Sequence, residues 1–148
     1  ARVCIGAEAA MPEPSRIRER FDSHFLRTDE AIAMATTWTA RHMHAQAIVA
    51  LTESGSTALM MSRGETGIPV YALTQHEATR RRMALCRGVY PVAFMPTALD
   101  TLKPTQEAVT LLREMNILES GDRVLLTKGD FTGPGGTNAM KIVRLEDQ

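Results

Sequence analysis

Short apolar runs alternate with helix-like segments along most of this chain. The clearest run, AIVAL at 47–51, ends in TESGST at 52–57, a cluster of residues that favour turns. A nearly continuous apolar run is typical of a strand whose two sheet faces are both covered, as in parallel sheets. We therefore predict buried parallel strands that are connected by helices through right-handed crossovers.

The predicted elements follow one another in a regular order. Strands are expected at 46–51, 69–73, 89–94 and 123–127, and helices at 28–44, 57–62, 77–86 and 104–116. Thr28 is the expected N-cap of the first helix, and Arg87-Gly88 the C-terminal end of the third. Pro91 has no backbone N–H, which places the third strand near a sheet edge or an irregularity.

The C-terminal segment predicts a change of strand direction. The loop at 129–136 is too short for a helical crossover, so the alternating segment 140–145 should return antiparallel beside the fourth strand. The predicted fold is therefore an α/β domain with three layers, α/β/α. Its five-stranded mixed sheet is mostly parallel and has an antiparallel last strand.

Length and charge exclude several classes of protein. The 148 residues suffice for one domain with a real core, and 17 basic residues balance 17 acidic ones. A net charge of +0 argues against nucleic-acid binding, so the run Arg80-Arg81-Arg82 is interpreted as a solvated helix face. We expect no signal peptide and no membrane span. Two distant cysteines, Cys4 and Cys86, indicate reduced thiols in a cytoplasmic protein.

The turn at 52–57 has two possible roles. A strand that runs through hydroxyl residues and glycine into a helix leaves backbone N–H groups able to bind a phosphate. Alternatively, Ser54 or Ser56 simply caps the helix. Ligands of parallel α/β sheets bind beyond the carboxyl ends of the strands, where the segment 127–136 should also lie. This convergence favours the phosphate site; the loop itself is either a closing lid or a long hairpin connection.

Catalytic and metal motifs are not recognisable in the sequence. His42 and His44 are two residues apart on a helix and so point in different directions. The chain lacks Gly-x-Ser-x-Gly and the Gly-Lys-Ser/Thr ending of a P-loop. Cys4 and Cys86 are interpreted as small buried hydrophobes. We expect no metal site and no acid–base pair, which counts against an independent small α/β enzyme.

Several spaced motifs resemble the C-terminal domain of bacterial pyruvate kinase, and together they span the whole chain. They are LTESGSTA at 51–58, MSR at 61–63, PVYALT at 69–74, CRGVYP at 86–91, Gly121-Asp122 and TNAMKI at 137–142. The resemblance implies that residues 1–27 are the end of a preceding barrel helix and a tether. Residues 28–148 would then be the effector-binding domain of a longer enzyme.

The resemblance also implies a function and its site. The parent enzyme would transfer phosphate from phosphoenolpyruvate to ADP on a barrel domain that uses magnesium and potassium. This domain would have no catalytic residue, metal or cofactor of its own and would regulate the enzyme allosterically. The effector phosphate would be held by Thr52, Glu53, Ser54, Gly55, Ser56 and Thr57. The effector loop would comprise Gly129, Asp130, Phe131, Thr132, Gly133, Gly135 and Gly136.

Departures from the animal enzymes indicate the class of effector. Forms activated by fructose 1,6-bisphosphate have a basic residue where this chain has Glu53, and a Trp-Arg pairing where it has Asp130 and Phe131. AMP or a sugar monophosphate is therefore the expected effector. The expected partners are this effector, the parent's barrel domain and further copies in a homotetramer, through the last strand and the helix from Thr28. The alternative is a purely structural oligomerisation module that binds no effector.

Overall fold

The structure is a computed structural model that describes residues 2–10, 24–64, 66–97, 103–129 and 136–146. Its strands are β1 (Ala47–Leu51), β2 (Val70–Thr74), β3 (Val89–Ala93), β4 (Arg123–Lys128) and β5 (Ala139–Arg144). Its helices are α1 (Arg2–Ala10), α3 (Thr28–His42), α4 (Ser56–Ser62), α5 (Glu77–Met83) and α6 (Lys103–Glu114).

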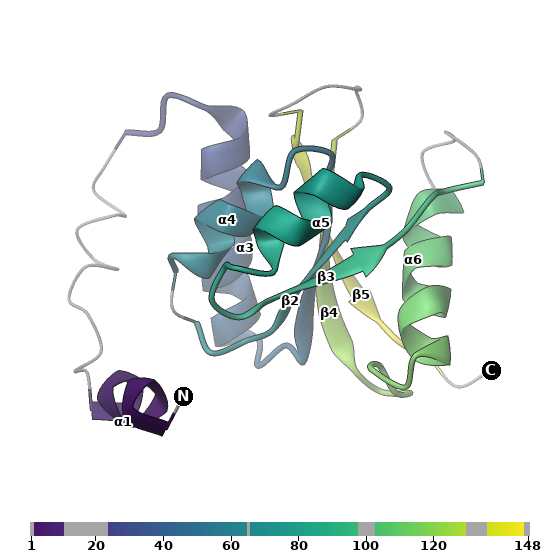
Figure 1. The fold of residues 1–148 in the computed structure, drawn as a ribbon. Coiled ribbons are helices and arrows are strands. Elements are labelled where there is room, and N and C mark those ends of the chain that lie inside the picture. The colour runs from purple at the N-terminus through teal and green to yellow at the C-terminus, as the bar shows by residue number, and fades with distance from the viewer. Residues whose placement is uncertain (1, 11–23, 65, 98–102, 130–135, 147–148) are drawn as a thin grey trace.

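The five strands form one mixed sheet in the order β3-β2-β1-β4-β5, as Figure 1 shows. Strands β1 to β4 are parallel to their neighbours, and β5 returns antiparallel beside β4, with Thr127 opposite Met140. The predicted α/β fold and its antiparallel last strand are confirmed. Pro91 lies on β3, an edge strand that pairs only with β2 among the described residues. Its missing N–H therefore removes no hydrogen bond between the inner strands of the sheet.

Two hydrophobic cores fill the space on the two faces of the sheet. Helices α3, α4 and α5 cover one face and α6 covers the other (Figure 1). Alternate residues of β1 enter the two cores: Ile48 packs under α4, whereas Val49 packs under α6. Both faces of the strand are therefore buried, which explains why its sequence is apolar throughout.

Small side chains allow α3 to lie close to the sheet. Ala33, Thr37 and Ala40 recur every three or four residues and are buried. Burying the threonine is tolerated because its hydroxyl donates to the carbonyls of Ala33 and Met34, at 3.0 and 2.9 Å.

Several predicted helix ends were wrong. Thr28 is the first residue of α3 and Arg27 is its N-cap, while the carboxylate of Asp29 accepts the Glu30 N–H at 3.0 Å. This helix ends at His42 rather than His44. Helix α5 ends at Met83, so the segment 84–88 is a turn and Arg87-Gly88 is not its C-cap. Tertiary contacts of the chain before and after each helix move these boundaries, which local propensity alone does not register.

Candidate functional site: the rim at the carboxyl ends of the parallel strands

The turn after β1 and the segment before β5 meet at one edge of the sheet. Strands β1 and β4 are adjacent and parallel, with Ala50 opposite Thr127, so their carboxyl ends lie together. The hydroxyls of Thr57 and Thr137 share a buried hydrogen bond of 2.8 Å, although the two residues are 80 positions apart. The predicted convergence of the two segments is therefore confirmed for their described residues.

The turn contains one left-handed residue, Gly55, which has a φ of +79° and is the N-cap residue of α4. The N-cap residue is therefore Gly55 rather than Ser54 or Ser56, and Gly55 makes no side-chain cap hydrogen bond. The Ser54 hydroxyl instead donates to the Ser56 hydroxyl at 3.2 Å and accepts the Ser56 N–H at 3.4 Å. The Thr52 hydroxyl accepts the Gly55 N–H at 2.9 Å. Side-chain oxygens therefore shape the turn, and one of them, that of Ser54, bonds the first N–H of α4.

Backbone donors gather at this turn. Within the described parts of the chain, the N–H groups of Ser54, Thr57 and Ala58 have no hydrogen-bond acceptor. Such orphan N–H groups carry partial positive charge at a helix start, and consecutive ones can surround an anion. A second unpaired group lies near the end of β4, where the fully buried Thr127 hydroxyl has no partner among the described residues.

Helix α5 holds the turn from the side of the neighbouring strand. The Thr79 hydroxyl donates to the Glu53 carbonyl at 2.7 Å, and the Arg82 guanidinium donates to the Ser54 carbonyl at 2.6 Å. Met83 packs so closely against Gly55 that a Cβ there would lie 2.6 Å from its sulfur. These three residues lie on one face of α5, and their spacing in the sequence indicates that shared face but not its contacts with the turn.

The arginine run of α5 was only partly a solvated face. Arg81 fits that prediction, since it is exposed and pairs with Glu77 at 2.6 Å. Arg82 instead reaches the turn, and Arg80 donates to the carbonyls of Thr74 and Gln75 at 3.4 and 3.3 Å. The bonds from Arg80 and Arg82 cannot be inferred from the sequence, because their acceptors are backbone carbonyls near the ends of two different strands.

The predicted effector loop is described only at its two ends. Gly129 is exposed, and a Cβ on it would overlap the Gly136 carbonyl, so only glycine fits where the chain leaves β4. Asp130, Phe131, Thr132, Gly133 and Gly135 lie outside the described residues. The loop's role over a ligand stays a prediction.

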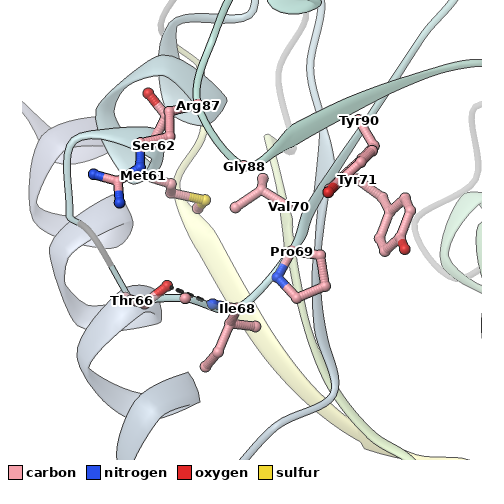
Figure 2. Close-up of a pocket in the computed structure, with 11 residues that line it drawn as sticks. Met61, Ser62, Thr66, Ile68, Pro69, Val70, Tyr71, Arg87, Gly88 and Tyr90 are labelled. Carbon is pink, nitrogen blue, oxygen red and sulfur yellow. Dashed lines mark hydrogen bonds between the residues drawn. The ribbon is translucent and has the colours of Figure 1, made fainter. Parts of the chain in front are cut away.

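A separate cavity of about 320 Å³ opens at the opposite end of the sheet, where β2 and β3 begin (Figure 2). Its walls include Met61 and Ser62 of α4, the segment 66–71, and Arg87, Gly88 and Tyr90. Tyr71 and Tyr90 stack with ring centroids 5.5 Å apart, and burial together with the Tyr90 charge raises the pKa of Tyr71. This cavity lies away from the predicted phosphate turn and shares none of its residues.

No three His, Cys, Asp or Glu side chains gather closely enough to hold a metal ion in the described part of the chain. None of the described helices has the length and hydropathy required to cross a bilayer. Cys86 is only partly buried; its sulfur lies 3.9 Å from the Arg82 carbonyl, so it is not the fully buried hydrophobe that was expected.

The fold and the rim together define a mixed-sheet α/β domain with a donor-rich turn at the carboxyl ends of its parallel strands. The profile of the family described as pyruvate kinase, alpha/beta domain, matches residues 30–143. The chain belongs to this family.

Curated relatives agree with this assignment. The chain is 44% identical over 148 residues to pyruvate kinase II of Salmonella typhimurium, covering 99% of this chain and 30% of the relative. It is 40% identical over 147 residues to a pyruvate kinase of Buchnera aphidicola, covering 98% of this chain and 30% of that protein. A Haemophilus influenzae pyruvate kinase is 38% identical over 147 residues, with 99% and 30% covered. The chain thus spans less than a third of the length of these relatives.

Proposed function

We propose that this chain is the regulatory C-terminal domain of a pyruvate kinase and binds the phosphate of an allosteric effector at the turn 52–57. The observation that carries the proposal is the cluster of N–H groups of Ser54, Thr57 and Ala58, which have no acceptor among the described residues, beside the hydroxyls of the same turn. Backbone N–H groups and hydroxyls are donors of the kind that phosphate oxygens accept. The Thr57–Thr137 bond ties this turn to the segment that leads out of the proposed effector loop.

The charges at the turn favour an effector with one phosphate. The exposed Glu53 adds a negative charge beside the donors, while Arg82 adds one positive charge from α5. A second phosphate would meet the carboxylate without another cation from the turn itself, and like charges repel strongly in a partly dry site. AMP or a sugar monophosphate therefore fits this turn better than fructose 1,6-bisphosphate.

The remaining functions follow from family membership and extend this proposal. The parent would transfer phosphate from phosphoenolpyruvate to ADP with magnesium and potassium bound outside residues 28–148. Residues 1–27 would lead out of its barrel domain, and the whole enzyme would act in the cytoplasm as a homotetramer. Copies would meet through α3 and β5: α3 contacts β5, and Trp38 and Ile142 are each 44% exposed. Large apolar side chains left exposed beside an edge strand are typical of an assembly surface.

Ligand binding tests the effector proposal directly. Calorimetry and thermal unfolding of the 148-residue chain would use AMP, ribose 5-phosphate, glucose 6-phosphate, fructose 1,6-bisphosphate and inorganic phosphate. A ligand at about a hundred times its Kd should add roughly 2.7 kcal/mol to the free energy of unfolding. That gain corresponds to a rise in Tm of about 5–11 °C for a domain of this size.

Two variants control this experiment. Ser54→Glu places a carboxylate among the donors and should abolish the shift caused by a monophosphate. Thr110→Glu adds the same charge on an exposed position of α6, across the sheet, and should leave the shift unchanged. If no ligand binds the wild-type chain, the effector proposal fails. The exposed Glu53 would then favour the alternative, a structural oligomerisation module.

A further inference from the structure

We infer that α5 is the element that orients the phosphate-binding amide of Ser54 in the turn, and that Thr79 and Arg82 are its positioning residues. The inference rests on the proposed effector site and adds residues that lie outside the turn and the loop. Thr79 and Arg82 are three positions apart on α5, and each donates to a successive carbonyl of the turn, those of Glu53 and Ser54.

The planarity of the peptide bond turns these two bonds into an orientation of the N–H groups. In a trans peptide the C=O and the following N–H point in opposite directions. Because the Glu53 carbonyl faces Thr79, the Ser54 N–H faces away from α5 and toward the rim. The Ser54 carbonyl faces Arg82, so the Gly55 N–H also faces away, as its bond of 2.9 Å to the Thr52 hydroxyl shows.

The turn needs such an external restraint because its central residue is conformationally permissive. Gly55 has a φ of +79°, and glycine passes readily between left-handed and right-handed conformations. Met83 restrains it on one side by packing, since any Cβ at position 55 would lie 2.6 Å from the Met83 sulfur. The three contacts from α5 therefore hold the two consecutive peptide planes between Glu53 and Gly55 in a single orientation.

Arg82 also sets the charge of the site. A guanidinium has five N–H donors and remains charged at any physiological pH. One of these donors bonds the carbonyl of Ser54, which lies between the exposed Glu53 and the Gly55 N-cap. The guanidinium therefore adds one positive charge beside the turn that carries the Glu53 carboxylate.

Matched variants of α5 distinguish the effect of peptide orientation on phosphate binding from the effect of charge. Thr79→Val removes the hydroxyl with little change in shape, and Thr79→Ser retains it. Arg82→Gln removes the charge, and Arg82→Lys retains it. Arg81→Gln removes the adjacent arginine, whose partner is Glu77 rather than the turn. The probes are inorganic phosphate and AMP, with Kd measured by calorimetry at several salt concentrations. NMR would follow the amide proton of Ser54 during the phosphate titration.

Thr79→Val should weaken phosphate binding about tenfold, the value of one well-placed hydrogen bond, and should reduce the shift of the Ser54 amide. Thr79→Ser should bind within about threefold of wild type. Arg82→Gln should weaken binding about tenfold and flatten its salt dependence, whereas Arg82→Lys should preserve the salt dependence. Arg81→Gln should leave the Kd within about twofold.

Two results would overturn the inference, and they differ in what else they overturn. If the wild-type chain binds phosphate but Thr79→Val and Arg82→Gln bind it equally well, α5 does not orient the site and the proposed function stands. If the wild-type chain binds neither phosphate nor AMP, the proposed effector site and this inference both fail. A lower Tm of a variant with an unchanged Kd belongs to the first case, because it shows a purely structural role.

Discussion

Substituting Gly55 by alanine should destabilise the domain through two separate effects. The first is conformational: a φ of +79° is left-handed and costs a residue with a Cβ about 1–2 kcal/mol. The second is steric, because the new Cβ would lie 2.6 Å from the sulfur and 2.8 Å from the terminal methyl of Met83. Met83 is only 1% exposed, so its side chain can move only into packed core, which typically costs about 1–3 kcal/mol.

Together these effects should lower the free energy of unfolding by about 2–4 kcal/mol, after a gain of roughly 0.4–1 kcal/mol from the stiffer unfolded chain. For a domain of this size, the Tm should fall by about 4–16 °C. Urea and thermal unfolding monitored by far-UV circular dichroism would measure both quantities.

Gly121→Ala is the matched control for the steric effect. Gly121 has a φ of +87°, but a Cβ there would meet nothing within 4 Å. This variant should therefore lose only about 1 kcal/mol, from backbone conformation alone. In a cycle with Met83→Ala, the double variant should lose less stability than the sum of the single variants. Equal losses for Gly55→Ala and Gly121→Ala would refute the argument that Met83 packing fixes the turn.

Two other predictions test the rim and the contact between the segment after β3 and α6. Thr137→Val should cost about 1–3 kcal/mol, because it leaves the buried Thr57 hydroxyl unpaired. The double variant with Thr57→Val should recover most of that loss in urea unfolding, and a fully additive loss would contradict the pairing. The Thr97 hydroxyl and N–H donate to the Glu107 carboxylate and lower its pKa. These bonds therefore stabilise the fold at pH values above the ordinary pKa of a glutamate, about 4.3. Their contribution is lost as the pH falls through the lowered pKa of Glu107. Glu107→Gln should therefore have a lower Tm than wild type at pH 7, and this difference in Tm should become smaller in acid. A difference in Tm that does not change with pH would contradict the stabilising role of the ionised Glu107.

Local patterns in the sequence were sufficient for the architecture. The apolar run at 47–51 predicted a strand covered on both faces, and β1 contributes to both cores. The short connection at 129–136 predicted the antiparallel return of β5, because a helical crossover needs more residues. Pro91 predicted an edge, since a residue without an N–H is tolerated there. Each of these inferences depends on a period, a length or a backbone donor that can be read within one segment.

The contacts that shape the rim were decided only by the tertiary structure. The sequence identified the turn at 52–57, but it assigned the cap to a serine and the Arg80–Arg82 run to solvent. The structure instead joins Glu53 to Thr79, Ser54 to Arg82 and Thr57 to Thr137, pairs that are 26, 28 and 80 residues apart. Local periodicity in the sequence indicates which face of a helix is buried. A hydrogen bond, however, depends on which distant backbone carbonyl or hydroxyl reaches that face. Only the packing of α5 against β2 and β3, and of β5 beside β4, places those partners next to the turn.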